Sequence, residues 1–217
     1  PKSNANYGWI LNMVSKLSEN GVAGFILANG ALSGGGEEYK IRRKLIENNL
    51  VEAIVILPRN MFYTTDISVT LWILNKNKTE HTVELPDTTR NYRNREDEIL
   101  FMDLRQIGEP FEKKYTQFSE QHIDDIAKTY HSWQQKDTDY EDVPEYCHSA
   151  SLEEVAKKDF SLVPSKYIEF VNRDENINFD EKMTALQTEL SDLLQLEAES
   201  QTQLLNVFKE LGYGLKL

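Results

Sequence analysis

Two apolar, β-branched runs separated by a short polar connection constrain the fold of this chain more than any other feature. The runs cover residues 51–57 and 67–74. Val and Ile favour strands because their branched side chains restrict χ1 and pack well on a pleated sheet. The connection of roughly ten residues is shorter than the dozen or more that a parallel crossover needs. The sequence therefore predicts two antiparallel neighbouring strands joined by a loop.

This loop carries two adjacent aromatic residues, Phe62 and Tyr63, followed by Thr64, Thr65 and Asp66. No turn chemistry in the segment calls for aromatic side chains. Phe62 and Tyr63 could therefore stack on a planar ligand that Thr65 and its neighbours hydrogen-bond. Packing against the core is the alternative, and the sequence leaves both open.

The first half of the chain alternates helical and strand patterns. Apolar residues recur every three to four positions over 7–20 and again over 37–48, which predicts two amphipathic helices. Residues 22–28 are continuously apolar, which is typical of a strand covered on both faces. Alternating helices and apolar strands indicate an α/β fold with a parallel sheet, here with an antiparallel last strand. We interpret the chain as entering this sheet midway, so that the opening strands precede Pro1.

The second half is more polar and less regular. Residues 81–97 predict an exposed loop, in which Arg90 and Arg93 could contact a DNA backbone or could simply be solvated. The further elements predicted are a strand at the sheet edge over 98–103, a helix over 119–134, a short strand over 143–149 and a short helix after the capping-box residue Ser151.

The tail gives the second strong pattern, because residues 180–211 contain neither Gly nor Pro. A helix of about 30 residues would be ~45 Å long, which favours a partner helix from another chain in a coiled coil or bundle. An intrachain helical hairpin is the alternative. We predict a domain over 1–170 and a helical assembly tail over 171–217. The apolar residues that fall on a heptad seam, interrupted by Glu197 and Ser200, are Met183, Leu186, Leu190, Leu193, Leu204, Val207 and Leu211.

Charge and composition exclude several classes of function. A net charge of −12 makes the chain a poor DNA-binding protein by itself, so a partner would have to supply most of the DNA contact. No apolar run approaches the ~18 residues of a membrane span, and no signal peptide opens the chain. The single cysteine, Cys147, predicts a buried apolar position, no metal site and a reducing, cytoplasmic setting. The glycines at 34–36 match no phosphate-binding motif and predict a flexible loop before a helix.

Four stretches, taken together, resemble a known family. They are residues 21–27, residues 36–45, residues 57–65 with the closing 75–78, and residues 160–168 before a long terminal helix. In this order they resemble the modification subunit of type I restriction–modification systems, an adenine-specific DNA methyltransferase. The resemblance covers most of the chain and suggests the C-terminal portion of such a subunit.

The resemblance implies a Rossmann-like, seven-stranded methyltransferase sheet that uses S-adenosylmethionine. Residues 22–28, 51–57 and 67–74 would be its last three strands. The family binds the cofactor through a glycine-rich turn and holds the adenine amine with an Asn/Asp-Pro-Pro-Phe/Tyr segment. Neither motif occurs here, so we expect the catalytic and cofactor-binding residues before Pro1 and no methylation by this part alone.

The resemblance also implies roles for the loop and the tail. Phe62 or Tyr63 would contact an adenine flipped out of the duplex, and the heptad seam would bind the specificity subunit that reads the DNA. The sequence leaves open whether a restriction (nuclease) subunit joins. Two other functions stay open: a non-catalytic assembly scaffold that binds a partner through its helix, and a different adenine methyltransferase with its own recognition domain.

Overall fold

The computed structural model describes residues 5–86, 88–171 and 178–213. By their contacts they divide into two units, Pro1–Val171 and Asn172–Leu217. The helices are α1 (Asn6–Lys16), α2 (Gly36–Glu47), α3 (Glu120–Gln134), α4 (Leu152–Lys157) and α5 (Phe179–Glu210), with 3-10 turns at Asn29–Leu32 and Pro164–Lys166. The strands are β1 (Val22–Ala28), β2 (Val51–Ile56), β3 (Val69–Asn75), β4 (His81–Leu85), β5 (Thr88–Tyr92), β6 (Glu98–Asp103), β7 (Glu109–Phe111), β8 (Tyr115–Gln117) and β9 (Cys147–Ser151).

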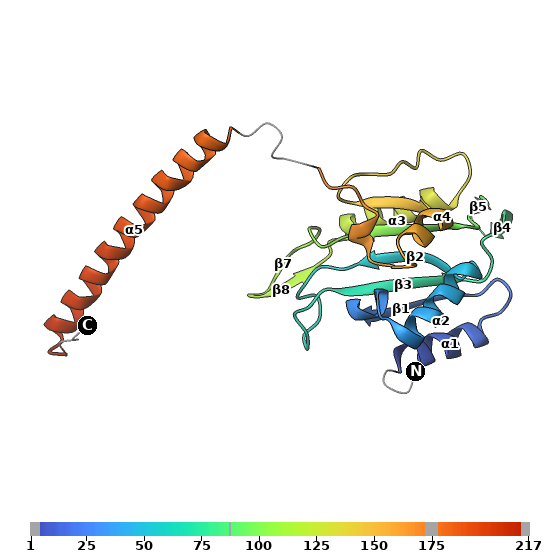
Figure 1. Cartoon of the computed structure of the whole chain (residues 1–217), viewed down its shortest axis with the longest axis horizontal. Coiled ribbons are helices and arrows are strands. Elements are labelled where there is room, and N and C mark those ends of the chain that lie inside the picture. Colours follow the sequence, from blue (N-terminus) through green and yellow to red (C-terminus); the bar gives the residue numbers. More distant parts are fainter. Residues whose placement is uncertain (1–4, 87, 172–177, 214–217) are drawn as a thin grey trace. The chain divides into compact units, whose positions relative to one another are not determined.

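A five-stranded sheet in the order β1-β3-β2-β6-β9 forms the centre of the first unit (Figure 1). β3 pairs antiparallel with both β1 and β2, as the short β2–β3 connection predicted. β2 and β6 are parallel, and β9 pairs antiparallel with β6. The sheet is therefore mixed and mostly antiparallel, because β3 returns between two strands that run in the same direction. The expectation of a parallel sheet with 67–74 as its antiparallel last strand was therefore wrong in two respects, since most pairs are antiparallel and β6 and β9 follow β3 in the same sheet.

Helices cover the two faces of the sheet. Side chains alternate along β2, so that Ile54 lies in the core under α1, α2 and α4, whereas Val55 lies in the core under α3. All six residues of β2 are buried, which is why this strand is an uninterrupted apolar run apart from Glu52. The helices predicted over 7–20, 37–48 and 119–134 correspond to α1, α2 and α3.

Strand β1 departs from its prediction. Its residues alternate between exposed and half-buried, with Val22 55% and Ile26 46% exposed. The expectation of a strand covered on both faces was wrong, because β1 is the outermost strand of the described sheet on its side. Its second edge pairs with no strand among the described residues, so β1 presents both an apolar face and a free backbone edge.

The second half holds more structure than its polar sequence suggested. The predicted loop over 81–97 contains the hairpin of β4 and β5, and Arg95 within it is fully buried. β6 was predicted at the sheet edge but lies inside it, because β9 adds a further strand at 147–151 in place of the predicted 143–149. Ser151 caps α4 as predicted, since its side chain accepts a hydrogen bond from the Glu154 amide.

A buried polar network joins the β4–β5 hairpin to the sheet. Arg95 Nε lies 3.0 Å from Glu52 Oε1, and both side chains are 0% exposed. Glu52 also accepts hydrogen bonds from Asn75 Nδ2 at 2.7 Å and from Gln134 Nε2 at 3.1 Å. A buried charge needs a partner, so the Arg95–Glu52 pair holds the polar segment against the sheet.

The second unit is the long helix α5. It spans 32 residues, Asn178 caps its first turn, and none of its residues is buried. The predicted tail helix is therefore present, whereas the coiled coil stays a prediction. Within the ranges that the structure describes, no helix combines the length and apolarity needed to cross a membrane.

We expect the Glu52→Gln substitution to destabilise the protein strongly. It keeps the shape of the side chain but leaves the Arg95 guanidinium buried without its counter-charge, which typically costs about 3–5 kcal/mol. Urea unfolding of this variant and of Glu47→Gln, an exposed member of an i,i+4 pair, measures the difference. Equal losses in the two variants would show that the buried pair does not hold the hairpin.

We expect stability to rise between neutral and moderately alkaline pH through Lys78. Burial lowers the pKa of its ammonium to about 8, although Glu52 acts in the opposite direction. Protonated Lys78 therefore opposes folding below about pH 8, and this effect fades as the pH rises toward the ordinary value of 10.5. Between pH 7 and 9.5 the free energy of unfolding should rise by about 2 kcal/mol relative to Lys78→Met. If the free energies of unfolding of the two proteins change in parallel with pH, the predicted role of Lys78 is contradicted.

Candidate functional site

The β2–β3 loop, residues 57–68, lies at the carboxyl ends of β2 and β6. Its ends are closed by a hydrogen bond from the Leu57 amide to the Val69 carbonyl oxygen at 2.8 Å. Asn60 adopts the left-handed conformation, with φ 61°. A tight turn follows in which the Thr65 amide donates to the Phe62 carbonyl oxygen at 3.3 Å. The tip of the loop is thus a defined turn that projects from the sheet.

This turn gives the two aromatic residues different environments. Phe62 is half-buried and packs against the core cluster under α3. Tyr63, by contrast, is 72% exposed. Phe62 thus anchors the loop to the core, whereas the Tyr63 ring is exposed to solvent.

The hairpin of β7 and β8 lies beside this loop, and the two project from the same end of the sheet (Figure 1). The Thr116 amide donates to the Asn60 carbonyl oxygen at 3.0 Å. The rings of Tyr63 and Tyr115 meet edge to face, with centroids 4.8 Å apart. A cavity of about 620 Å³ opens between the loop and the hairpin. This hairpin was not predicted from the sequence, in which its signal is an aromatic residue on either side of the polar residues 112–114, Phe111 and Tyr115.

The two predicted arginines lie elsewhere. Arg90 is half-buried on β5, at the opposite end of the sheet from β7 and β8 (Figure 1). Arg93 makes two hydrogen bonds to the Glu98 carboxylate, at 2.7 and 3.0 Å, and a third to the Trp133 carbonyl oxygen at 2.7 Å. Burial opposes ionisation of Glu98, but the hydrogen bonds and charge of Arg93 hold its pKa below the usual value. The structure therefore brings together Phe62, Tyr63 and Thr65 but not Arg90 and Arg93.

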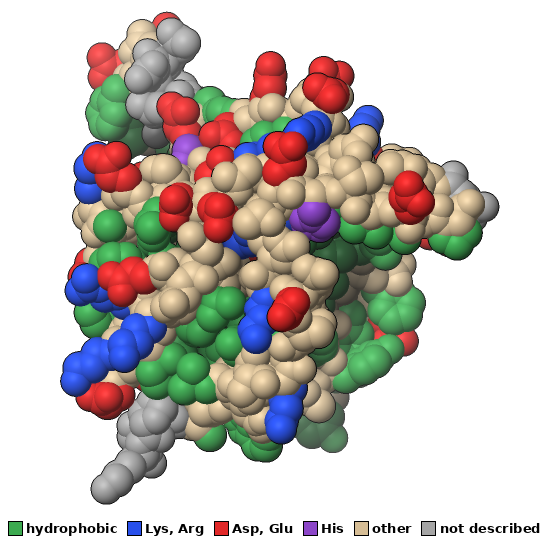
Figure 2. All heavy atoms as spheres, turned by 90° about the vertical axis from the view of Figure 1, so that its right-hand side faces the viewer, with side chains coloured by type: hydrophobic (Ala, Val, Ile, Leu, Met, Phe, Trp, Pro, Cys, Tyr) green, Lys and Arg blue, Asp and Glu red, His purple; other side chains and the backbone are tan. Residues whose placement is uncertain are grey.

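The surface at the end of the molecule that carries β4 and β5 is not strongly basic. Figure 2 shows acidic side chains gathered over its upper part, with basic side chains interspersed. Such a mixed surface offers little net attraction to a phosphate backbone.

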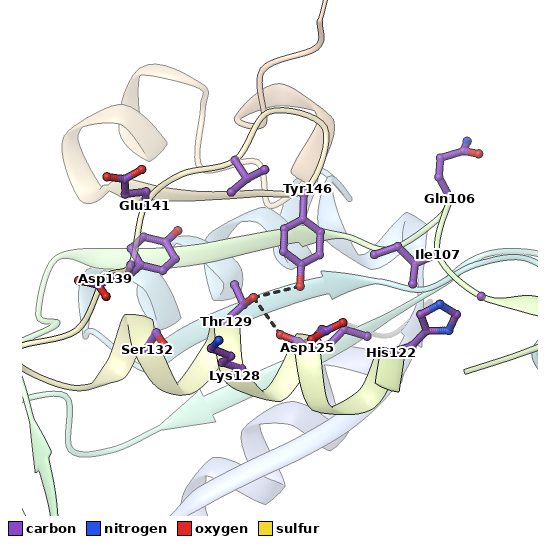
Figure 3. Close-up of a pocket in the computed structure, with 14 residues that line it drawn as sticks. Gln106, Ile107, His122, Asp125, Lys128, Thr129, Ser132, Asp139, Glu141 and Tyr146 are labelled. Atoms are coloured by element: carbon purple, nitrogen blue, oxygen red, sulfur yellow. Dashed lines mark hydrogen bonds between the residues drawn. The ribbon is translucent and has the colours of Figure 1, made fainter. Parts of the chain in front are cut away.

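A second cavity, of about 640 Å³, lies between α3 and the segment 139–146. The Thr129 hydroxyl links the Asp125 carbonyl oxygen, at 3.0 Å, to the Tyr146 hydroxyl, at 3.2 Å (Figure 3). Carboxylates of Asp125, Asp139 and Glu141 line the cavity. They disfavour an anionic ligand, and no group of His, Cys, Asp or Glu in the described ranges could hold a metal ion. We assign no role to this cavity.

Gly34 and Gly35 precede α2 in a loop, as predicted, whereas Gly36 is the first residue of the helix. The Gly34 carbonyl oxygen accepts a hydrogen bond from Arg42 Nη1 at 2.7 Å. Glu37 and Glu38 occupy the first turn of α2, where they would repel phosphate. Cys147 is buried as predicted, and burial raises the pKa of its thiol.

Comparison with known proteins agrees with this geometry. The N-6 DNA Methylase family matches residues 1–176. The HindI methylase subunit of the type I restriction enzyme of Haemophilus influenzae is 36% identical over 215 residues, or 98% of this chain and 45% of that protein. The MjaIX methylase subunit of Methanocaldococcus jannaschii is 31% identical over 214 residues, which are 98% of this chain and 36% of that protein.

Two solved structures share the fold. The type I restriction-modification methyltransferase subunit from Streptococcus thermophilus superposes with a TM-score of 0.64 at 28% identity, covering 79% of this chain and 31% of that one. The EcoKI M protein superposes with a TM-score of 0.57 at 20% identity, covering 91% of this chain and 44% of that one.

The described sheet shares the α/β fold of the methyltransferase subunits of type I restriction–modification systems. The chain belongs to the N-6 DNA methylase family, and its relatives are named as methylase subunits of type I restriction enzymes. The resemblance predicted from the sequence is confirmed. The chain spans less than half of the length of these relatives.

Proposed function

We propose that this chain is part of the modification subunit of a type I restriction–modification system, a DNA adenine-N6 methyltransferase. The full-length subunit would transfer a methyl group from S-adenosylmethionine to an adenine flipped out of the duplex, in complex with a specificity subunit. The match of residues 1–176 to the N-6 DNA methylase family carries this proposal. The antiparallel pairing of β3 with β2 supports it, since the resemblance implied an antiparallel strand over 67–74.

Cofactor binding and catalysis would reside mainly in segments that precede Pro1. The glycine-containing loop after β1 is held by contacts within the chain, since the Gly34 carbonyl oxygen accepts a hydrogen bond from Arg42 Nη1 at 2.7 Å. Asn29, directly after β1, is already bonded to the Thr70 hydroxyl at 2.6 Å. The free edge and exposed apolar face of β1 support further strands beside it. We therefore expect this part alone to be inactive.

The β2–β3 loop would contact the target base. A flipped adenine leaves the duplex at a cost of a few kcal/mol, which stacking in a pocket offsets. Tyr63 is the suited partner, because its ring is exposed at the carboxyl end of the sheet and Tyr115 restricts its motion. Phe62 anchors the loop through the core, and the Thr65 amide closes its turn. An oriented base would present its amine to the methyl donor, which is the kind of positioning that accelerates a bimolecular transfer.

This assignment is tested by two variants of the full-length subunit. We expect Tyr63→Ala to lower the methylation rate about tenfold or more, since stacking on an aromatic ring is worth ~1–3 kcal/mol per base. Tyr63→Phe should retain most activity, and the melting temperature should not change in either. Phe62→Ala should instead lower the melting temperature, because it removes a ring that packs on the core. An active Tyr63→Ala subunit would refute the base contact.

Helix α5 would bind the specificity subunit. Its heptad seam is exposed along the whole helix, with Met183 40%, Leu190 57% and Leu204 55% exposed. Such a stripe favours burial against a partner helix in a coiled coil or bundle. Because the chain has a net charge of −12, the specificity subunit would supply much of the DNA contact. The seam residues that lie within α5 are Met183, Leu186, Leu190, Leu193, Leu204 and Val207.

We expect the double substitution Leu190→Glu and Leu193→Glu to abolish co-purification with the specificity subunit while the sheet stays folded. A matched control is Thr188→Glu with Gln195→Glu, which adds the same charge on the side of α5 away from the seam. Co-expression pull-downs and thermal melts measure both effects. Undiminished binding by the leucine variant, or equal loss in the control, would contradict the role of the seam.

A further inference from the structure

The β7–β8 hairpin is a structural unit distinct from the central sheet. Its two strands of three residues pair only with each other, in the register Glu109 to Gln117 and Phe111 to Tyr115. All three residues of β7 are exposed. A two-stranded hairpin is marginally stable by itself, so its place must be set by its anchors.

Two anchors hold the hairpin beside the β2–β3 loop. The first is the hydrogen bond from the Thr116 amide to Asn60, with the Tyr63–Tyr115 ring contact next to it. The second is Gly108, which has φ +125° and whose added Cβ would lie 2.7 Å from Thr116 Cγ2. Only glycine tolerates this backbone conformation and approach. The hairpin is thus directed to the end of the sheet that carries the proposed base contact.

The cavity between the loop and the hairpin is lined mainly by basic charge. Four basic residues line it together with one acidic residue, Glu109. Arg59 is paired with Asp66 at 3.3 Å, and Arg105 with Asp103 at 2.6 Å. The four basic residues are Arg59, Arg105, Lys113 and Lys114.

The two lysines at the hairpin tip differ from the two arginines. Neither Lys113 nor Lys114 has a carboxylate within ion-pair distance in the part of the chain that the structure describes. Lys114 Nζ lies 5.1 Å from the centre of the Tyr115 ring. The Glu109 carboxylate accepts a hydrogen bond from Gln117 Nε2 at 3.0 Å. Glu112 is the acidic neighbour of the two lysines in the turn. On a chain of net charge −12, two lysines that form no ion pair with a described carboxylate lie beside two tyrosines, and together they offer a local contact to a polyanion with planar groups.

We propose that the β7–β8 hairpin binds the phosphate backbone of the DNA next to the flipped base, through Lys113 and Lys114. This inference rests on the proposed function and extends it to residues outside the β2–β3 loop. Contacts to phosphates carry no sequence information but fix the position of the duplex. The hairpin thus holds the strand while Tyr63, packed on Tyr115, meets the base.

The test uses the complete modification enzyme, reconstituted from the full-length subunit and its specificity subunit, with a duplex that contains the target site. Lys113→Gln with Lys114→Gln should weaken DNA binding about tenfold near physiological salt. The logarithm of the DNA association constant falls linearly with the logarithm of the salt concentration. The magnitude of this slope should decrease by about 2, because each lost phosphate contact decreases it by about 1. Lys113→Arg with Lys114→Arg should restore both quantities.

The matched control, Lys40→Gln with Lys157→Gln, removes the same charge from side chains that are 67% and 72% exposed. It should leave the salt slope unchanged. If the hairpin variant behaves like this control while the unsubstituted complex methylates DNA, the hairpin inference alone is overturned. A correctly assembled, unsubstituted complex that neither binds nor methylates the duplex overturns the proposed function and the inference with it.

Discussion

The antiparallel pairing of β3 with both β1 and β2 is the constraint on which the rest of the first unit depends. β3 lies between β1 and β2, which run in the same direction as each other and opposite to β3. Its hydrogen bonds therefore connect the halves of the sheet that α1–β1 and α2–β2 supply. Trp72 at its centre is fully buried and its ring contacts Tyr7 of α1 and Phe25 of β1. Because β3 starts where β2 ends, the chain must reverse at the carboxyl edge of the sheet. The exposed aromatic loop therefore follows from strand order rather than from local sequence.

The sequence predicted the parts of the fold that follow from local patterns. Continuous β-branched runs marked β2 and β3, periodic apolar residues marked α1 to α3, and loop length gave the antiparallel turn. The sequence did not predict that residues 81–97 fold onto the sheet. Arg95 is a charged residue, and it lies in a segment without a periodic apolar pattern. Its burial depends on Glu52, 43 residues earlier in the chain. Only the folded structure brings these two charges together. A periodic pattern of apolar residues reports local secondary structure and cannot indicate an ion pair between distant residues.

The candidate site shows the same division. The sequence indicated that Phe62 and Tyr63 were unusual in a loop, but it could not separate them. The structure separates them through one turn, which directs Phe62 to the core and Tyr63 to solvent. Arg90 and Arg93 looked equally suited to contact DNA, since positive charge in a polar segment carries no information on what it faces. Arg93 is bound to Glu98 and Trp133, whereas the lysines without counter-charge lie on a hairpin some 20 residues further on.

The distribution of charge reconciles an acidic chain with a role on DNA. A net charge of −12 weakens non-specific attraction to a duplex, so any contact that this chain makes with DNA depends on places where positive charge is exposed. Lys113 and Lys114 supply such a place beside the aromatic loop, and both lie on a hairpin whose direction Gly108 sets. The edge-to-face contact between Tyr63 and Tyr115 joins the two segments before any ligand arrives. The loop and the hairpin then lose less conformational entropy when DNA binds, so more of the contact energy contributes to affinity. A loop and a hairpin that are each marginal alone thus become one preorganised surface.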